Sequence, residues 1–190
     1  MARFGLLLAP GAGAGSDQPG LVAIDEAVTA IGGVVRRMDF PYRLEGRRAP
    51  DKPPKLIRSV LEEAAALSRQ TGLTPQRIYL GGRSMGGRMC SMAVAQGLQC
   101  AGLVLVSYPL HPPGKPASLR TAHFGSLTLP CLFVSGARDA FASPDELRLA
   151  LAGVPGPVTT VFVQGGDHGL RRKEQDVAAI VAGWLTERVH

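Results

Sequence analysis

A serine lies in a glycine-rich pentapeptide between an apolar run and a helix-like segment. Residues 82–86 read Gly-Arg-Ser-Met-Gly and follow an apolar run at residues 78–80. The pattern Gly-x-Ser-x-Gly at a strand-to-helix turn is typical of a nucleophile elbow, which projects the serine from the strand tip. The dipole of the following helix favours negative charge there. We therefore predict that Ser84 is a nucleophile; the alternative is an ordinary glycine-rich turn.

A serine nucleophile needs a general base, and the base needs an acid that orients it. No Asp or Glu lies between Glu63 and Asp139, so Asp139 is the first carboxylate after the serine, just past an apolar run. His168 follows the last apolar run, in Gly-Gly-Asp-His-Gly. The order Ser, Asp, His is that of an α/β-hydrolase triad. Asp167 is a rival acid, but a direct neighbour of the histidine reaches the far side of its ring with difficulty.

The tetrahedral intermediate of acyl transfer needs N–H donors for its oxyanion. We expect one donor to be the backbone N–H of Met85, directly after the serine. The second is expected from Ala12, in the Gly-Ala-Gly-Ala-Gly loop that follows the first apolar run. A phosphate-binding loop is the rival interpretation, but no Lys precedes Ser16 as that motif requires.

Three residues near the predicted nucleophile are expected to bind substrate: Arg83, Tyr108 and His111. Arg83 precedes the serine and could hold an anionic group, or simply contact solvent and backbone. Tyr108 and His111 belong to residues 108–116, which contain four prolines and would form a stiff wall of the pocket. A lone loop histidine is more often structural. No metal-ligand spacing is present, and we predict no metal and no cofactor.

Short apolar runs that alternate with amphipathic segments would position these residues. A helix in nearly every gap predicts a mostly parallel six-stranded sheet in a three-layer α/β/α sandwich, with right-handed crossovers. In such a sheet the chemistry lies at the carboxyl ends of the strands. The expected strands are 4–9, 34–40, 77–80, 103–106, 131–135 and 158–163, and the expected helices are 21–31, 54–70, 85–96, 144–152 and 173–188.

Composition limits the class of protein. The chain has 190 residues, of which 45% are hydrophobic and 19% charged, which indicates one globular domain over residues 1–190. The longest apolar run is far shorter than a membrane span, and the N-terminal run breaks at Pro10 before it could form a signal peptide. The three cysteines lack paired spacing and are expected to be reduced thiols. We expect a cytoplasmic protein that does not contact membranes; the sequence predicts no oligomeric state.

The positive charge is concentrated in residues 36–58. This segment contains eight Lys and Arg residues and three Asp and Glu residues, so its net charge is +5, out of +6 for the whole chain. Such a segment could attract an anion or a nucleic acid. Without interleaved aromatic residues or a helix-turn-helix pattern, nucleic-acid binding is the weaker interpretation and a solvated basic face the stronger.

The combination of motifs resembles a known family. It consists of residues 11–15, 81–88, 108–116 and 166–168. Together they are similar to the small α/β-hydrolases related to dienelactone hydrolase, a group that includes the testis-expressed and KANSL-type proteins of animals. The resemblance covers essentially the whole chain. It implies a minimal hydrolase core without a helical lid, with Ser84 as nucleophile, Asp139 as acid and His168 as base. The chain differs from the family in Pro10-Gly11, where His-Gly is common, and from dienelactone hydrolase itself in having serine rather than cysteine as nucleophile.

The resulting functional hypothesis is a serine hydrolase that acts on a small ester or thioester through an acyl-enzyme. Acyl transfer to an acceptor other than water is a variant that the sequence does not separate from hydrolysis. Two alternatives of another class remain: a non-catalytic binding or scaffold protein on the same fold, and an anion or nucleic-acid binder that uses residues 36–58. The first would not need an intact triad, and the second would be indifferent to Ser84→Ala.

Overall fold

The computed structural model describes residues 2–189 and contains a six-stranded sheet. The strands run in the order β2-β1-β3-β4-β5-β6, and each neighbouring pair is parallel. Their bounds are β1 Phe4–Ala9, β2 Gly33–Arg37, β3 Ile78–Arg83, β4 Gly102–Val106, β5 Cys131–Gly136 and β6 Val158–Val163. The predicted sheet is therefore confirmed, with parallel pairing throughout these strands.

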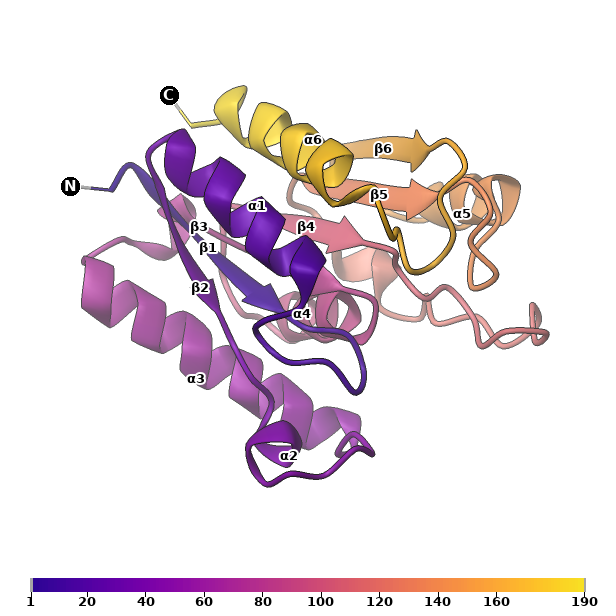
Figure 1. Cartoon of the computed structure of the whole chain (residues 1–190), viewed down its shortest axis with the longest axis horizontal. Helices are drawn as coiled ribbons and strands as arrows, with labels where there is room; N and C mark the ends of the chain where they lie inside the picture. Colours follow the sequence, from indigo (N-terminus) through magenta and orange to yellow (C-terminus); the bar gives the residue numbers. More distant parts are fainter. Residues whose placement is uncertain (1, 190) are drawn as a thin grey trace.

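Helices cover both faces of the sheet, as the sandwich prediction requires (Figure 1). One face carries α1 (Pro19–Ala30) and α6 (Glu174–Thr186), which lie side by side. The other carries α3 (Pro53–Thr71), α4 (Met85–Ala95) and α5 (Pro144–Leu151). Along β1, Leu6 and Leu8 point to the face covered by α1 and α6, and Leu7 and Ala9 point to the face covered by α3, α4 and α5. This alternation explains why β1 is a continuous apolar run, since both of its faces are buried.

The chain adds strands on opposite sides of β1, which makes β1 the point where the order of the strands switches. From β1 the chain crosses to β2 on one side and later enters β3 on the other, so the loops after β1 and β3 open beside each other. Open parallel sheets bind ligands in the crevice beyond such a switch point. The fold therefore brings the loop after β1 next to the serine turn after β3.

The sequence prediction placed several element ends incorrectly and missed a short helix. β2 ends at Arg37 rather than at residue 40, because the chain turns there into α2 (Pro41–Leu44). Phe40 and Tyr42 are buried beside this turn and stack on each other. Four residues are too few to show a helical period. β3 starts one residue later than predicted and extends to Arg83, since residues 75–77 form a 3-10 turn.

The remaining composition-based expectations concern thiols, membranes and charge. All three cysteines are free, and burial raises the pKa of the Cys90 thiol. Within residues 2–189, no helix is long and apolar enough to cross a membrane. Half of the eight cations in residues 36–58 form ion pairs with other described residues: Arg36 with Glu63, Arg37 with Asp25, Arg47 with Glu45 and Asp51, and Lys55 with Glu45 and Asp51. These partners offset much of the positive charge that the sequence places in this segment.

Candidate active site

Ser84 lies at the turn between β3 and α4 in a backbone conformation that serine rarely adopts. Its φ is 51° and its ψ is −118°, and its N–H donates a 2.8 Å hydrogen bond to the carbonyl of Val106. A Cβ at Gly82 or at Gly86 would lie 2.1 or 2.2 Å from the carbonyl oxygen of Ala9. Both glycines are needed because β1 passes directly against the turn. This packing holds the strained serine at the carboxyl edge of the sheet.

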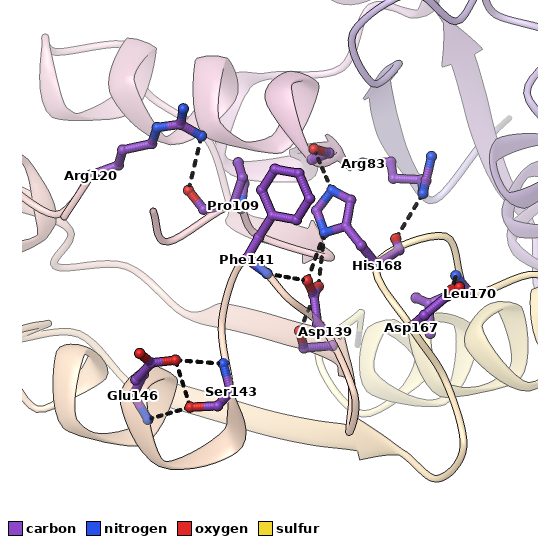
Figure 2. A network of polar contacts seen from close by, with 12 residues as sticks. Arg83, Pro109, Arg120, Asp139, Phe141, Ser143, Glu146, Asp167, His168 and Leu170 are labelled. Atoms are coloured by element: carbon purple, nitrogen blue, oxygen red, sulfur yellow. Dashed lines mark hydrogen bonds and ion pairs between the residues drawn. The ribbon is translucent and has the colours of Figure 1, made fainter. Parts of the chain in front are cut away.

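His168 connects Ser84 to the buried carboxylate of Asp139, and Figure 2 shows the imidazole against this carboxylate. Its Nε2 lies 2.8 Å from Ser84 Oγ, and its Nδ1 lies 2.9 Å from both carboxylate oxygens of Asp139. Asp139 is 4% exposed and also accepts a 2.8 Å hydrogen bond from the N–H of Phe141. A carboxylate at Nδ1 leaves Nε2 as the basic nitrogen that faces the serine. The structure thus brings together the three side chains that the sequence singled out.

Two neighbours restrict how the imidazole of His168 can move. The ring of Phe141 stacks on it, with centroids 3.9 Å apart and planes 24° from parallel. The guanidinium of Arg83 donates a 2.7 Å hydrogen bond to the His168 carbonyl (Figure 2). The rival acid, Asp167, instead accepts a 3.0 Å hydrogen bond from the N–H of Leu170. Asp139 is therefore the carboxylate that orients the ring.

The loop after β1 is anchored by residues at the end of β2 and in α2. The Tyr42 hydroxyl accepts a 3.0 Å hydrogen bond from the N–H of Gly13. Asp39 accepts hydrogen bonds from both the N–H and the hydroxyl of Ser16, at 2.7 and 2.6 Å. These contacts fix residues 11–16 without a covalent link, and they were not predicted because the partners lie far apart in the chain.

The loop residue Ala12 lines the same pocket as Ser84, and its N–H is available to a ligand. Gly11 donates to Gln18, Gly13 to Tyr42 and Ala14 to Gly11. Within the described part of the chain, the Ala12 N–H donates to no other group. Met85 begins α4, where the first N–H groups of a helix have no partner in that helix. Both predicted oxyanion donors line the pocket that contains Ser84.

That pocket has a volume of about 400 Å³. Its lining residues are Gly11, Ala12, Arg83, Ser84, Met85, Arg88, Pro109, Arg120, Phe141 and His168. Arg83 therefore lies at the predicted place, and burial lowers the pKa of its guanidinium. Arg88, Arg120 and Phe141 were not predicted. Arg88 could have been found from its position one helical turn after the serine, whereas the other two lie on loops without a periodic pattern.

Tyr108 and His111 lie elsewhere. Tyr108 is 1% exposed, its ring packs with Phe124 and Phe133, and its hydroxyl donates a 2.7 Å hydrogen bond to the carbonyl of Arg120. His111 is 4% exposed, and its ring lies 3.5 Å from Glu146. Neither lines the pocket, so the structure does not place these two residues where a substrate at Ser84 would contact them. The proline-rich segment contributes Pro109 instead.

Three features of this structure define the class of α/β hydrolases. They are a parallel sheet with helices on both faces, a serine at a strand-to-helix turn, and a histidine–carboxylate pair at neighbouring strand ends. A model of the alpha/beta hydrolase domain family matches residues 2–181 of the chain. The chain therefore belongs to this family. The predicted resemblance to small α/β-hydrolases related to dienelactone hydrolase is confirmed at this level, while the narrower testis-expressed and KANSL-type group stays a prediction.

Solved structures of similar fold include three from bacteria. Est1E of Butyrivibrio proteoclasticus, with ferulic acid bound, has a TM-score of 0.81 and 16% identity, over 98% of this chain and 89% of that one. A dienelactone hydrolase of Anabaena variabilis has a TM-score of 0.79 and 17% identity, over 100% of this chain and 88% of that one. A putative hydrolase of the α/β superfamily from Xanthomonas campestris pv. campestris has a TM-score of 0.72 and 20% identity, over 98% of this chain and 99% of that one. At these identities the likeness concerns the fold.

Proposed function

We propose that the protein is a serine hydrolase that cleaves a small ester or thioester. The observation that carries the proposal is the continuous row of contacts from Asp139 through His168 to Ser84, which opens into a pocket with free N–H groups. Membership of the α/β hydrolase family supports it. A pocket of about 400 Å³ suits a small acyl group and leaving group.

The reaction would follow the acyl-enzyme route. Ser84 Oγ attacks the substrate carbonyl as its proton passes to Nε2 of His168, and the N–H groups of Met85 and Ala12 hold the oxyanion. Collapse of this intermediate breaks the bond to the leaving group, which takes the proton from His168. Water then attacks the acyl-enzyme with the histidine as base, which releases the acid and free Ser84. Asp139 stabilises the imidazolium that forms in both steps.

An activated serine can be tested without knowledge of the substrate. Wild-type protein is treated with a fluorophosphonate probe and analysed by intact mass spectrometry, beside Ser84→Ala and the control Ser118→Ala. Ser118 is an exposed serine on the β4–β5 connection. We expect one adduct on the wild type and on the control, and none on Ser84→Ala. Absence of an adduct on folded wild type would contradict the proposal and favour a non-catalytic binding protein on this fold.

A further inference from the structure

Among residues 2–189, the lining of the pocket at Ser84 contains three arginines and no carboxylate. Arg83, Arg88 and Arg120 belong to the lining, whereas the carboxylate of Asp139 is fully buried behind the imidazole. A small ester without charge would gain nothing from this arrangement. Concentrated cations in a cleft attract and orient anions.

Arg88 and Arg120 stand without an acidic partner in the part of the chain that the structure describes. Neither forms an ion pair with any residue in the described range 2–189. The Arg88 Nε is buried and has no hydrogen-bond partner in that range. Arg120 makes one long contact, 3.4 Å, with the carbonyl of Pro109 (Figure 2). Burial lowers the pKa of Arg120, and the nearby positive charge of Arg88 lowers it further.

Uncompensated cations that repel each other in a pocket raise the energy of the empty site. This contrasts with residues 36–58, where four cations have carboxylate partners. Arg88 lies on the first turns of α4, with its N–H bonded to the Ser84 carbonyl at 3.1 Å, so its backbone position is fixed relative to the nucleophile. Arg120 comes from the β4–β5 connection and reaches the same pocket. An anion bound between them would be held close to the scissile bond.

We propose that the substrate is an ester or thioester that carries an anionic group, and that Arg88 and Arg120 bind this group. The inference rests on the proposed function and narrows its substrate class. Carboxylate and phosphate share the chemistry that a guanidinium recognises.

Matched substrates test the proposal. One pair carries the charge on the acyl side: 4-nitrophenyl hydrogen adipate and its neutral counterpart 4-nitrophenyl methyl adipate. The other carries it on the leaving group: 4-carboxyphenyl butyrate and its methyl ester. We expect at least one anionic ester to have a kcat/KM about 10- to 100-fold above that of its neutral partner, as charge-assisted hydrogen bonds provide. Added salt should lower this ratio.

Variants assign the effect to residues. In Arg88→Gln and in Arg120→Gln, kcat/KM for the anionic ester should fall more than kcat/KM for the neutral ester. The ratio of the anionic to the neutral kcat/KM should therefore fall several-fold. The control is Arg58→Gln, which removes the same charge from an exposed position of α3 that forms no ion pair with a described residue. There the ratio should stay as in the wild type. If Arg88→Gln does not fold, the Arg120→Gln ratio and the wild-type ratios still test the proposal.

Further measurements separate failure of this inference from failure of the proposed function. Hydrolysis that depends on Ser84 but gives ratios near one for both pairs would overturn the anionic substrate and leave the hydrolase proposal intact. If no ester is hydrolysed, calorimetric titration of Ser84→Ala with adipate and with inorganic phosphate still measures anion binding. Binding of either anion that Arg88→Gln weakens at least tenfold supports the inference and shows which anion is preferred. No binding of either would overturn it.

Discussion

At the scale of single residues, Asp139 combines two tasks in the described site. Its carboxylate faces Nδ1 of His168, and it also accepts a hydrogen bond from the N–H of Phe141, the residue whose ring stacks on the same histidine. One buried carboxylate therefore holds both the imidazole of His168 and the residue whose aromatic ring stacks on that imidazole. The orientation of His168 depends on this group more than on its sequence neighbour Asp167, which bonds Leu170.

We expect Asp139→Asn to lower kcat by about 10³–10⁴-fold with a much smaller change in KM, because the amide favours the wrong imidazole tautomer. The measurement is steady-state hydrolysis of an ester that the wild type turns over, with circular dichroism as a check on folding. The matched control is Asp167→Asn, whose amide oxygen can still accept from Leu170, and it should keep most of the activity. Loss of activity in the control rather than in Asp139→Asn would reverse the assignment of the acid.

At the scale of elements, the contact between the end of β1 and the start of α4 determines the position of the nucleophile. Gly86 lies in the first turn of α4, where a Cβ would meet the carbonyl oxygens of Ala9 and Pro10 at 2.2 and 2.5 Å. Backbone atoms of a central strand cannot move away without disturbing the sheet. Helix propensity alone favours alanine here, so packing and propensity make opposite predictions for this glycine.

We therefore expect Gly86→Ala to lower the free energy of unfolding by about 1–3 kcal/mol or more, as overpacking does. The comparison is Gly183→Ala in α6, an exposed helical position where nothing lies within 4 Å of an added Cβ. It should raise stability by about 0.5–1 kcal/mol, the ordinary gain of alanine over glycine in a helix. Urea unfolding of both variants measures the difference; equal effects would show that the close approach is relieved at little cost.

At the scale of the whole molecule, the β4–β5 connection (residues 107–130) packs back onto α4 beside the active-site pocket. His123 of this connection pairs with the hydroxyl of Ser91 on α4, with 2.8 Å between Nε2 and Oγ. Burial lowers the pKa of His123 from 6.5 to about 4, and the positive charge of Arg88 contributes. The docking of this segment therefore depends on a neutral imidazole.

The direction of the pH effect follows from proton binding. Between about pH 4 and 6.5 the unfolded chain binds a proton at His123 that the folded chain does not. The contribution of this histidine to stability is thus complete above pH 6.5 and is lost as the pH falls toward 4. We expect His123→Gln to show a weaker decrease of melting temperature with acidification than the wild type. Parallel curves for the two proteins, measured by differential scanning calorimetry, would contradict this role.

The sequence by itself predicted what depends on local pattern. Apolar runs and amphipathic segments predicted the parallel sheet, and the loops after the strands predicted that Ser84, Asp139 and His168 lie at one edge, because parallel strands end together. The free N–H of Ala12 follows from a glycine-rich loop that the same reasoning identified. These features depend on short stretches of chain and on the geometry that all parallel sheets share.

Only the tertiary structure decided which side chains meet from distant loops. Phe141 on His168, Tyr42 on Gly13 and Arg120 in the pocket come from segments whose order in the chain carries no distance information. Tyr108 shows the converse, since its position after a strand tip suggested a pocket residue, yet its ring fills the core beside Phe133. The physical reason is that burial of apolar area selects the loop conformation. A residue's neighbours across loops therefore depend on the packing of the whole chain.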